Sequence, residues 1–262
     1  MKGLSKYKRV VVKVGSSSIT HDNGIINLSR IDDLAWELSN LKNHGLEVVL
    51  VSSGSIAAGA KRLNLKSRPR DVVGKQAASS VGQVALMNTY NRAFNVYDYC
   101  ASQILLTRQI EIDEIMRVNA INTFNELLKM NVIPVVNEND TISTFEIEFG
   151  DNDTLSAVVA RMIDADLLIL LSDIDGLYSD DPNKNPDAKF IERVTEISEN
   201  LQKMAKGSSS FLGTGGMCTK LNAAKLCIDK NIDVVIANSK DFSVIRKIIR
   251  GENIGTIFTR ES

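Results

Sequence analysis

Residues 132–156 read VIPVVNENDTISTFEIEFGDNDTLS. The stretch begins as an apolar, β-branched run and changes to polar residues at 137–140. A second polar cluster, at 151–153, comes directly before a segment with helical periodicity, and an alternating, hairpin-like segment joins the two clusters. A buried strand followed by a helix is typical of an α/β fold. The two carboxylate and amide clusters predict a site for a small polar molecule.

The helix that follows this stretch is predicted at 154–163. Its apolar residues share one stripe: Leu155, Val158, Val159, Met162 and Ile163. Asp153 precedes it and is predicted as the N-cap. The strand before the site carries Pro134, which cannot donate to a sheet ladder and therefore belongs at a strand start, a bulge or an edge.

Outward from this stretch, strand and helix patterns alternate along the chain. We expect strands at 7–14, 47–51, 104–107, 132–136, 167–171, 233–237 and 255–258. We expect helices from the N-cap Asn27 to Gly45, after 52–55, and at 76–90, 119–130, 154–163, 216–229 and 242–249. This order predicts a single α/β domain with a mainly parallel sheet. Two lobes are expected to share this sheet, with an approximate boundary near 164–166.

Composition narrows the class of protein. The chain has 262 residues and a formal net charge of −1, so no electrostatic argument favours nucleic acid or an anionic membrane as a partner. No apolar run approaches the ~20 residues of a membrane span. The three cysteines form no C-x-x-C pair and are odd in number, which predicts a reduced, cytoplasmic compartment.

Polar loops follow several of the predicted strands. They occupy 15–17, 52–55, 137–140 and 172–173, and a glycine-rich loop at 213–216 precedes a helix. Ligands of open α/β sheets bind beyond the carboxyl ends of the strands, and helix starts attract anions. An ordinary turn is the alternative for any single loop, but five together predict a site that handles phosphate.

The glycine-rich loop matches neither common nucleotide motif. Residues 213–220 read GTGGMCTK, in which Thr219 rather than glycine precedes the lysine, so this is not a Walker A loop. No G-x-G-x-x-G dinucleotide fingerprint is found in the sequence. The two histidines, His21 and His44, lie in polar segments and leave a Ser-His-Asp hydrolase without a base.

Lys13 is the most informative single residue of the first strand. It stands on an otherwise apolar strand directly before Gly15. Burying its ammonium group without a partner is costly, so we expect it to face an anion. The alternative is a lysine on an edge strand that reaches solvent.

Seven segments together resemble one known family. They are VVVKVGSSS (10–18), VSSGSIAAG (51–59), KQAASSVGQ (75–83), IPVVNEND (133–140), FGDNDTLSA (149–157), LLSDIDGLYSDDP (170–182) and GTGGMCTK (213–220). In this order they resemble the amino acid kinase family, and within it the branch that phosphorylates the side-chain carboxylate of glutamate in the first step of proline synthesis. The resemblance implies a three-layer αβα sandwich around a mainly parallel, eight-stranded sheet.

The resemblance also implies a role for each lobe. The N-terminal lobe, 1–165, would bind L-glutamate, and the C-terminal lobe, 166–262, would bind ATP. Substrate contacts carry over to Ser53, Gly54, Asp140 and Asn152. Nucleotide contacts carry over to Lys13, Ser172, Asp173, Thr214, Gly215, Gly216, Met217, Cys218, Thr219 and Lys220. The sequence ends at Ser262, without the C-terminal PUA domain that many relatives carry.

The expected chemistry needs charge rather than a base. A free glutamate side chain titrates near ~4.3 and is already ionised at neutral pH. Two unit charges about 4 Å apart repel by about 4 kcal/mol at an effective dielectric constant of about 20, so an anionic acceptor approaching the γ-phosphate needs cations. Lys13, Lys220 and Mg²⁺ are predicted to supply them, with Asp153 as the organiser of both lysines and Mg²⁺ held mainly by phosphates and water.

The sequence and the resemblance also predict an inhibitor and an oligomeric state, and they leave alternative functions open. Proline is implied as a feedback inhibitor that competes near Asp140, and a homo-oligomer is expected, with the small-residue surface at 76–85 as its interface. The competing interpretations are a kinase of the same fold for N-acetylglutamate or UMP, and a non-catalytic ligand-sensing module.

Overall fold

A computed structural model describes residues 6–143, 151–180, 182, 184–198, 201 and 216–260. The contacts divide the chain into two compact units. Unit 1 contains residues 1–13 and 150–262, and unit 2 contains residues 14–149. These boundaries differ from the division near 164–166, because residues 1–13 and the segment 150–165 group with unit 1. The assignment of one ligand to each predicted lobe stays a prediction.

The described strands include an eight-stranded, mainly parallel sheet, as the resemblance implied. In unit 2 the strand order is β3 (Ala101–Leu106), β4 (Ile133–Glu138) and β2 (Glu47–Val51), all parallel. In unit 1 the order is β1 (Arg9–Val14), β5 (Leu167–Ser172), β9 (Asp233–Asn238), β10 (Thr256–Phe258) and β8 (Arg193–Val194). β5 and β9 are parallel, whereas β10 is antiparallel to β9.

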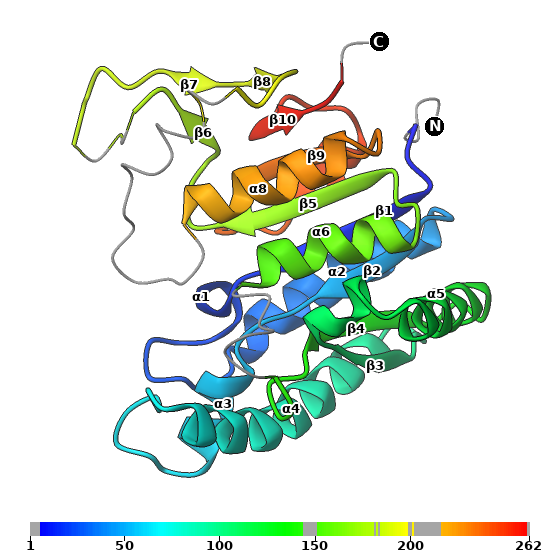
Figure 1. The fold of residues 1–262 in the computed structure, drawn as a ribbon, viewed down its shortest axis with the longest axis vertical. Coiled ribbons are helices and arrows are strands. Elements are labelled where there is room, and N and C mark those ends of the chain that lie inside the picture. Colours follow the sequence, from blue (N-terminus) through cyan, green and yellow to red (C-terminus); the bar gives the residue numbers. More distant parts are fainter. Residues whose placement is uncertain are drawn as a thin grey trace. The chain divides into compact units, whose positions relative to one another are not determined.

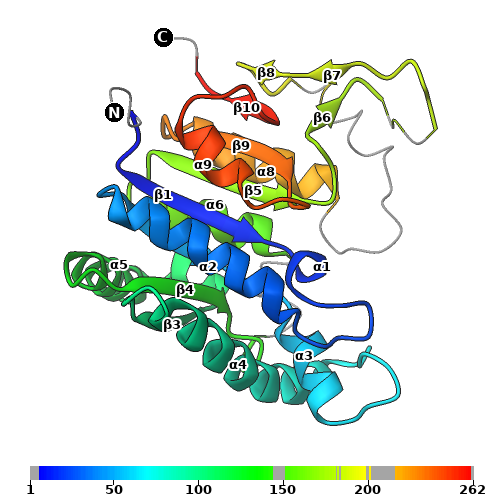
Figure 2. The same cartoon turned by 180° about the vertical axis from the view of Figure 1, so that it is seen from behind.

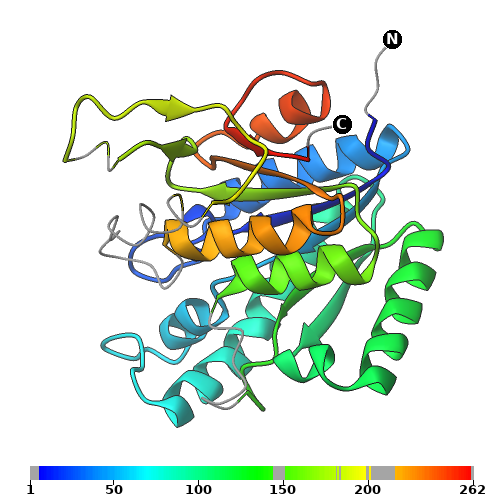
Figure 3. The same cartoon turned by 45° about the horizontal axis from the view of Figure 1, so that its top comes forward.

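Unit 1 is layered. The helices α6 (Asn152–Met162) and α8 (Met217–Ile228) lie side by side on one face of the sheet (Figures 1 and 3). The short helix α9 (Val244–Ile249) covers the other face (Figure 2). A separate two-stranded sheet pairs β6 (Leu177–Tyr178) with β7 (Phe190–Ile191). β5 is buried along its whole length, which explains its fully apolar sequence before Ser172.

Unit 2 carries helices on both faces of its three strands. α2 (Leu28–Asn43) packs on β2 and beside α4 (Val72–Asn95), and α5 (Glu114–Lys129) packs on β4 on the opposite face (Figures 1 and 2). α3 (Ser55–Arg62) packs against α4, and η1 (Arg108–Glu111) precedes α5. The predicted start of α2 is confirmed, because the Asn27 side chain accepts a hydrogen bond from the Arg30 amide. Gly45 ends that helix region at φ +84°.

Pro134 lies near the start of β4. On the side of β3 it is in register with Ser102, while pairing with β2 begins one residue later, at Val135. Successive amides of a strand point to opposite sides, and the Ile133 amide donates toward β3, to the Cys100 carbonyl. The missing N–H of Pro134 therefore faces the side where pairing has not yet begun, in agreement with the prediction of a strand-start position.

Two local predictions were wrong. The N-cap of α6 is Asp151, whose side chain accepts a hydrogen bond from the Thr154 amide; Asp153 lies inside the first turn. The segment after β1 is not only a polar loop, because a short helix, α1 (Ser16–Ile19), begins directly after Gly15. The hairpin-like segment at 144–150 lies outside the described residues.

Candidate functional site

The polar loops gather at the carboxyl ends of parallel strands within each unit. In unit 2, β2 and β4 are parallel, so the loop at 52–55 and the loop that begins at 139 lie at the same edge. In unit 1, β5 and β9 end at the same edge, where the Ser239 amide donates to the Ser172 carbonyl. The predicted loops are thus on the ligand-binding edge of their sheets.

The core of the unit 1 site is one carboxylate between two lysines. The Lys13 Nζ atom lies 2.6 Å from Asp153 Oδ1, and the Lys220 Nζ atom lies 3.2 Å from Asp153 Oδ2. Asp153 is fully buried, and Lys13 and Lys220 are only 8% and 4% exposed. The prediction that Lys13 faces an anion is confirmed, and that anion is a carboxylate of the protein.

Three elements bring these residues together. Lys13 is the penultimate residue of β1, Asp153 is in the first turn of α6, and Lys220 is in the first turn of α8. Thr219 adds a further contact, since its hydroxyl lies 2.8 Å from Asp153 Oδ2 and 2.7 Å from the Gly216 carbonyl oxygen. Both carboxylate oxygens of Asp153 therefore have partners, which supports a role in positioning the two lysines rather than a role as a general base.

The electrostatics of the cluster agree with this geometry. Burial acts to raise the pKa of the Asp153 carboxyl, but the positive charges of Lys13 and Lys220 outweigh it and hold that pKa below its ordinary value. Two ammonium groups and one carboxylate leave one positive charge in excess within the triad. Burial raises the pKa of the neighbouring Asp151 carboxyl. The triad is therefore a place that favours an additional negative group.

The glycine-rich segment is described only from Gly216 onward. Gly216 is the N-cap of α8, and Met217, Cys218 and Thr219 form the half-buried start of that helix. The amides of a first helical turn have no partner within the helix and favour anions. Thr214 and Gly215, also predicted as nucleotide contacts, lie outside the described residues.

Ser172 and Asp173 follow β5 at the same edge. Ser172 is buried and donates a hydrogen bond of 3.0 Å to Asp173 Oδ1, while Asp173 is exposed. Asp173 is thus available at the surface of unit 1. Its contact with a nucleotide stays a prediction.

In unit 2 the polar cluster centres on Asp140. The Ser79 hydroxyl donates to Asp140 Oδ2 at 2.6 Å, and the Ser55 hydroxyl lies 3.2 Å from the same oxygen. Gly54, at φ +89°, turns the chain into α3 with a conformation that favours glycine, next to Ser53. Sequence reasoning selected Asp140, Ser53 and Gly54 as substrate contacts; it placed Ser55 only in the polar loop 52–55 and did not select Ser79.

The residues on either side of Asp140 are also held in place. Ser143 donates to Glu138 Oε1 at 2.8 Å, and Gln76 Nε2 donates to the Ser143 carbonyl at 3.1 Å. Asn152, predicted to share a ligand with Asp140, belongs to unit 1. Its contact with that ligand stays a prediction.

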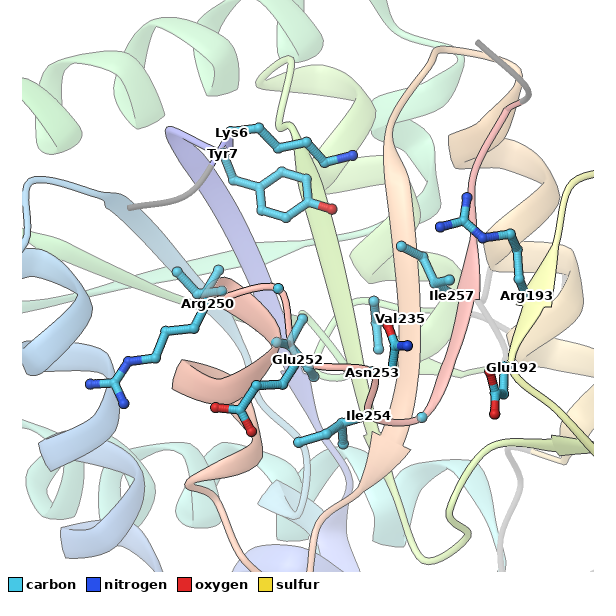
Figure 4. A pocket seen from close by; sticks show the side chains of 14 residues that line it. Lys6, Tyr7, Glu192, Arg193, Val235, Arg250, Glu252, Asn253, Ile254 and Ile257 are labelled. Atoms are coloured by element: carbon cyan, nitrogen blue, oxygen red, sulfur yellow. The ribbon is translucent and has the colours of Figure 1, made fainter. Parts of the chain in front are cut away.

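A cavity of ≈ 490 Å³ lies elsewhere in unit 1 (Figure 4). It is lined by Lys6 and Tyr7 before β1, by the end of α9, by the segment before β10 and by parts of β8 and β9. None of the predicted site residues lines it. Among the described residues, no three His, Cys, Asp or Glu side chains are grouped as a metal site, and no helix has the length and apolarity to cross a membrane.

Comparisons with known proteins agree with the fold. The model of the amino acid kinase family matches residues 8–238. A glutamate 5-kinase of Clostridium perfringens is 48% identical over 261 residues, covering 98% of this chain and 97% of that protein. One of Carboxydothermus hydrogenoformans is 50% identical over 256 residues, covering 97% of this chain and 68% of that longer protein.

Two solved structures share the fold. A UMP kinase from Bacillus anthracis has a TM-score of 0.65 at 18% identity, covering 98% of this chain and 97% of that one. An isopentenyl phosphate kinase has a TM-score of 0.66 at 18% identity, covering 96% of this chain and 100% of that one. At this identity the likeness concerns the three-layer architecture alone.

Proposed function

The chain belongs to the amino acid kinase family, among the glutamate 5-kinases, and we propose that it phosphorylates the side-chain carboxylate of L-glutamate with ATP. The product is L-glutamyl 5-phosphate, and the reaction is the first step of proline biosynthesis. The observation that carries the proposal is the buried Lys13–Asp153–Lys220 triad, because phosphoryl transfer needs positive charge at the transferred group.

The acceptor needs no general base. Its carboxylate is ionised at neutral pH, so no proton has to be removed before attack. Asp153 fits this chemistry, since its low pKa and its two engaged oxygens suit a fixed charge and not a proton acceptor. Its task is to hold Lys13 and Lys220 where negative charge develops in the transition state.

Each lysine has its own place in this scheme. Lys13, at the end of β1, and Lys220, at the start of α8, present ammonium groups to the phosphates of ATP from two elements. The first-turn amides from Met217 to Thr219 add partial positive charge. Ser172 and Asp173 are proposed to contact the nucleotide beyond β5.

The substrate amino acid is assigned to the unit 2 cluster. Asp140 is proposed to bind the α-ammonium group, with Asn152 as a further contact of glutamate. Backbone N–H groups near Ser53 and Gly54 are proposed to bind a carboxylate or the transferred phosphoryl group, because a chain turn of this kind directs amides at an anion.

Mg²⁺ is proposed to enter with ATP. Asp153 is the buried carboxylate beside the lysines, and its two oxygens already have partners, so the donor set fits a metal held through phosphate oxygens and water. When bound, the ion would neutralise phosphate charge.

Three further properties are proposed with the function. Proline inhibits by competing with glutamate near Asp140, which kinetics at several proline concentrations would test. The protein is proposed to be a homo-oligomer; the face of α4 with Ala78 and Gly82 is covered by α3, so an interface within 76–85 would use the exposed face of that helix. The cytoplasmic location predicted from three free cysteines stays a prediction.

The decisive experiment measures ADP release with ATP, Mg²⁺ and a set of acceptors, with hydroxylamine present to trap an acyl phosphate. We expect ADP and a hydroxamate with L-glutamate, and neither with N-acetyl-L-glutamate or UMP. ADP release with UMP and none with glutamate would overturn the proposed acceptor. ADP release without any acceptor-dependent product would overturn the kinase assignment itself.

A further inference from the structure

We propose that Ser79, supported by Ser55, is a positioning residue that aims Asp140 at the substrate's ammonium group and so makes the site selective for an unmodified amino acid. The proposal rests on the proposed function, in which Asp140 binds glutamate. It assigns a task to two serines on two helices that the sequence did not single out.

The first observation is that both hydroxyls converge on the same carboxylate oxygen. Ser79 Oγ lies 2.6 Å and Ser55 Oγ lies 3.2 Å from Asp140 Oδ2, and the two hydroxyl oxygens are 3.1 Å apart. Each hydroxyl has one hydrogen to donate. The short contact makes Ser79 the principal donor to Asp140, and Ser55 donates to the same carboxylate oxygen.

The second observation is the burial of the two donors. Ser55 is 4% exposed and Ser79 is 1% exposed, whereas Asp140 is only half-buried. Buried hydroxyls have no water to bond instead, so their preferred partner is this carboxylate. Asp140 Oδ1 accepts no hydrogen bond within the described part of the chain. In this proposal it is the oxygen that binds the ligand.

The third observation explains how two helices deliver their hydroxyls to one point. A Cβ atom at Gly82 would lie 1.8 Å from the Ser55 carbonyl oxygen, and one at Gly59 would lie 1.7 Å from the Ala78 carbonyl oxygen. α3 and α4 therefore touch backbone to backbone, directly beside Ser55 and Ser79. Only glycine permits this approach, which explains the presence of Gly59 and Gly82 in the small-residue segments 51–59 and 75–83.

The fourth observation is that α4 holds the Asp140 loop at a second point. Gln76 and Ser79 are three positions apart and share one face of the helix. Gln76 donates to the Ser143 carbonyl at 3.1 Å, and Ser143 donates to Glu138 Oε1 at 2.8 Å. The loop is thus anchored on both sides of Asp140, and the carboxylate keeps one orientation before substrate arrives.

The chemical consequence concerns which ligand is accepted. Hydrogen bonds to a carboxylate stabilise its charged form, and an ammonium group offers a charge-assisted partner for the remaining oxygen. An N-acylated amino acid has neither the charge nor the three donors. The serine pair therefore sharpens discrimination between L-glutamate and N-acyl-L-glutamate by holding the Asp140 carboxylate in the orientation that meets the ammonium group.

The test compares Ser79→Ala and Ser55→Ala with Ser80→Ala in the full-length protein. Ser80 is an exposed neighbour whose hydroxyl donates only to the Ala77 carbonyl among the described residues, so it serves as the matched control. For Ser79→Ala we expect the KM for L-glutamate to rise about tenfold, as for loss of one hydrogen bond to a charged group. Ser55→Ala should give a smaller rise, and the KM for ATP should stay unchanged in all three variants.

The split between KM and kcat separates positioning from a merely structural effect. In Ser79→Ala, kcat at saturating glutamate should stay near the wild-type value while the KM for glutamate rises, because the lost contact orients a ligand-binding group and does not touch the transferred phosphoryl group. A simple loss of folding would lower kcat and leave the KM of the remaining folded enzyme unchanged, and circular dichroism would detect it. If wild type is active but both variants keep the wild-type KM for glutamate, this inference is wrong. If wild type forms no hydroxamate with glutamate, the proposed function itself fails.

Discussion

Lys13 Nζ lies 2.6 Å from Asp153 Oδ1, although the two residues are far apart in the sequence. The strand that carries Lys13 belongs to the same compact unit as the helix that begins at Asn152. With Lys220 on the other oxygen, one buried carboxylate holds two ammonium groups. This relationship connects the first strand of the chain to the proposed phosphoryl transfer.

Replacing either lysine by alanine should reduce kcat far more than it raises KM. A positive charge that acts on developing negative charge stabilises the transition state more than the ground state, so we expect losses of about 10²–10³-fold in kcat for Lys13→Ala and Lys220→Ala. Steady-state kinetics with glutamate and ATP check this. Lys225→Ala, on the exposed side of α8, is the control and should retain wild-type rates. An unchanged kcat in either test variant would remove that lysine from the mechanism.

Asp153→Asn should destabilise the protein as well as inactivate it. The substitution keeps the shape of the side chain but leaves two buried ammonium groups without their counter-charge. Removing one partner of a buried ion pair costs about 3–5 kcal/mol. Urea denaturation should report this loss in the free energy of unfolding, and Asp173→Asn, an exposed carboxylate, should unfold like wild type. Equal stability of the two variants would contradict the role of the triad in holding the fold.

The free energy of unfolding of the wild-type protein should decrease at acid pH as Asp153 is protonated, and the Asp153→Asn variant should lack this decrease. The folded-state pKa of Asp153 lies below its ordinary value of 3.8. The unfolded chain therefore binds this proton first, and the contribution of Asp153 is present above that value and is lost as pH falls through the folded pKa. Unfolding free energies measured from neutral pH into this acid range should fall more steeply for wild type than for the variant. Parallel curves would show that the carboxylate is not stabilised by the lysines.

Asp140→Ala and Asn152→Ala should mainly raise the KM for glutamate. Both side chains are proposed to contact the amino acid, so their removal weakens a ligand contact common to ground state and transition state. Initial rates at varied glutamate and saturating ATP check this. A second series at varied ATP and saturating glutamate gives the KM for ATP. A selective rise in the KM for ATP would show that the assignment of ligands to the two clusters is reversed.

Gly82→Ala should disturb both stability and glutamate binding. A methyl group there meets a backbone oxygen at 1.8 Å, so α3 and α4 must separate and the two serines lose their common target. Overpacking of this kind costs about 1–3 kcal/mol or more. Thermal unfolding and the KM for glutamate should both change, whereas Val84→Ala on the exposed side of α4 should affect neither. Wild-type values for Gly82→Ala would mean that the helix contact does not position Asp140.

Much of this architecture could be read directly from local sequence. The alternation of apolar strands and helices predicted the α/β class, because each pattern reports which face of an element is buried. Lys13 could be singled out since a charge on a buried strand requires a partner. Two further features are also decided by adjacent residues of the chain: the start of α8 at Gly216 and the left-handed backbone conformation of Asn131.

Other features depended on contacts that no local pattern contains. Asp151 and Asp153 both precede the same helical stripe, and either could cap it by sequence alone. The packing of α6 against α8 distinguishes the two. It buries Asp153, the second residue of α6, beside Lys220, whereas Asp151 stays at the start of the helix as its N-cap. Likewise, Ser55 and Ser79 look like ordinary small residues of two helices until the glycine contact brings their hydroxyls to one oxygen. Local sequence patterns were sufficient to place the helices and strands and to identify the charges that needed partners. Which residues are those partners depends on the tertiary structure, since ion pairs and hydrogen bonds depend on distances between residues far apart in the chain.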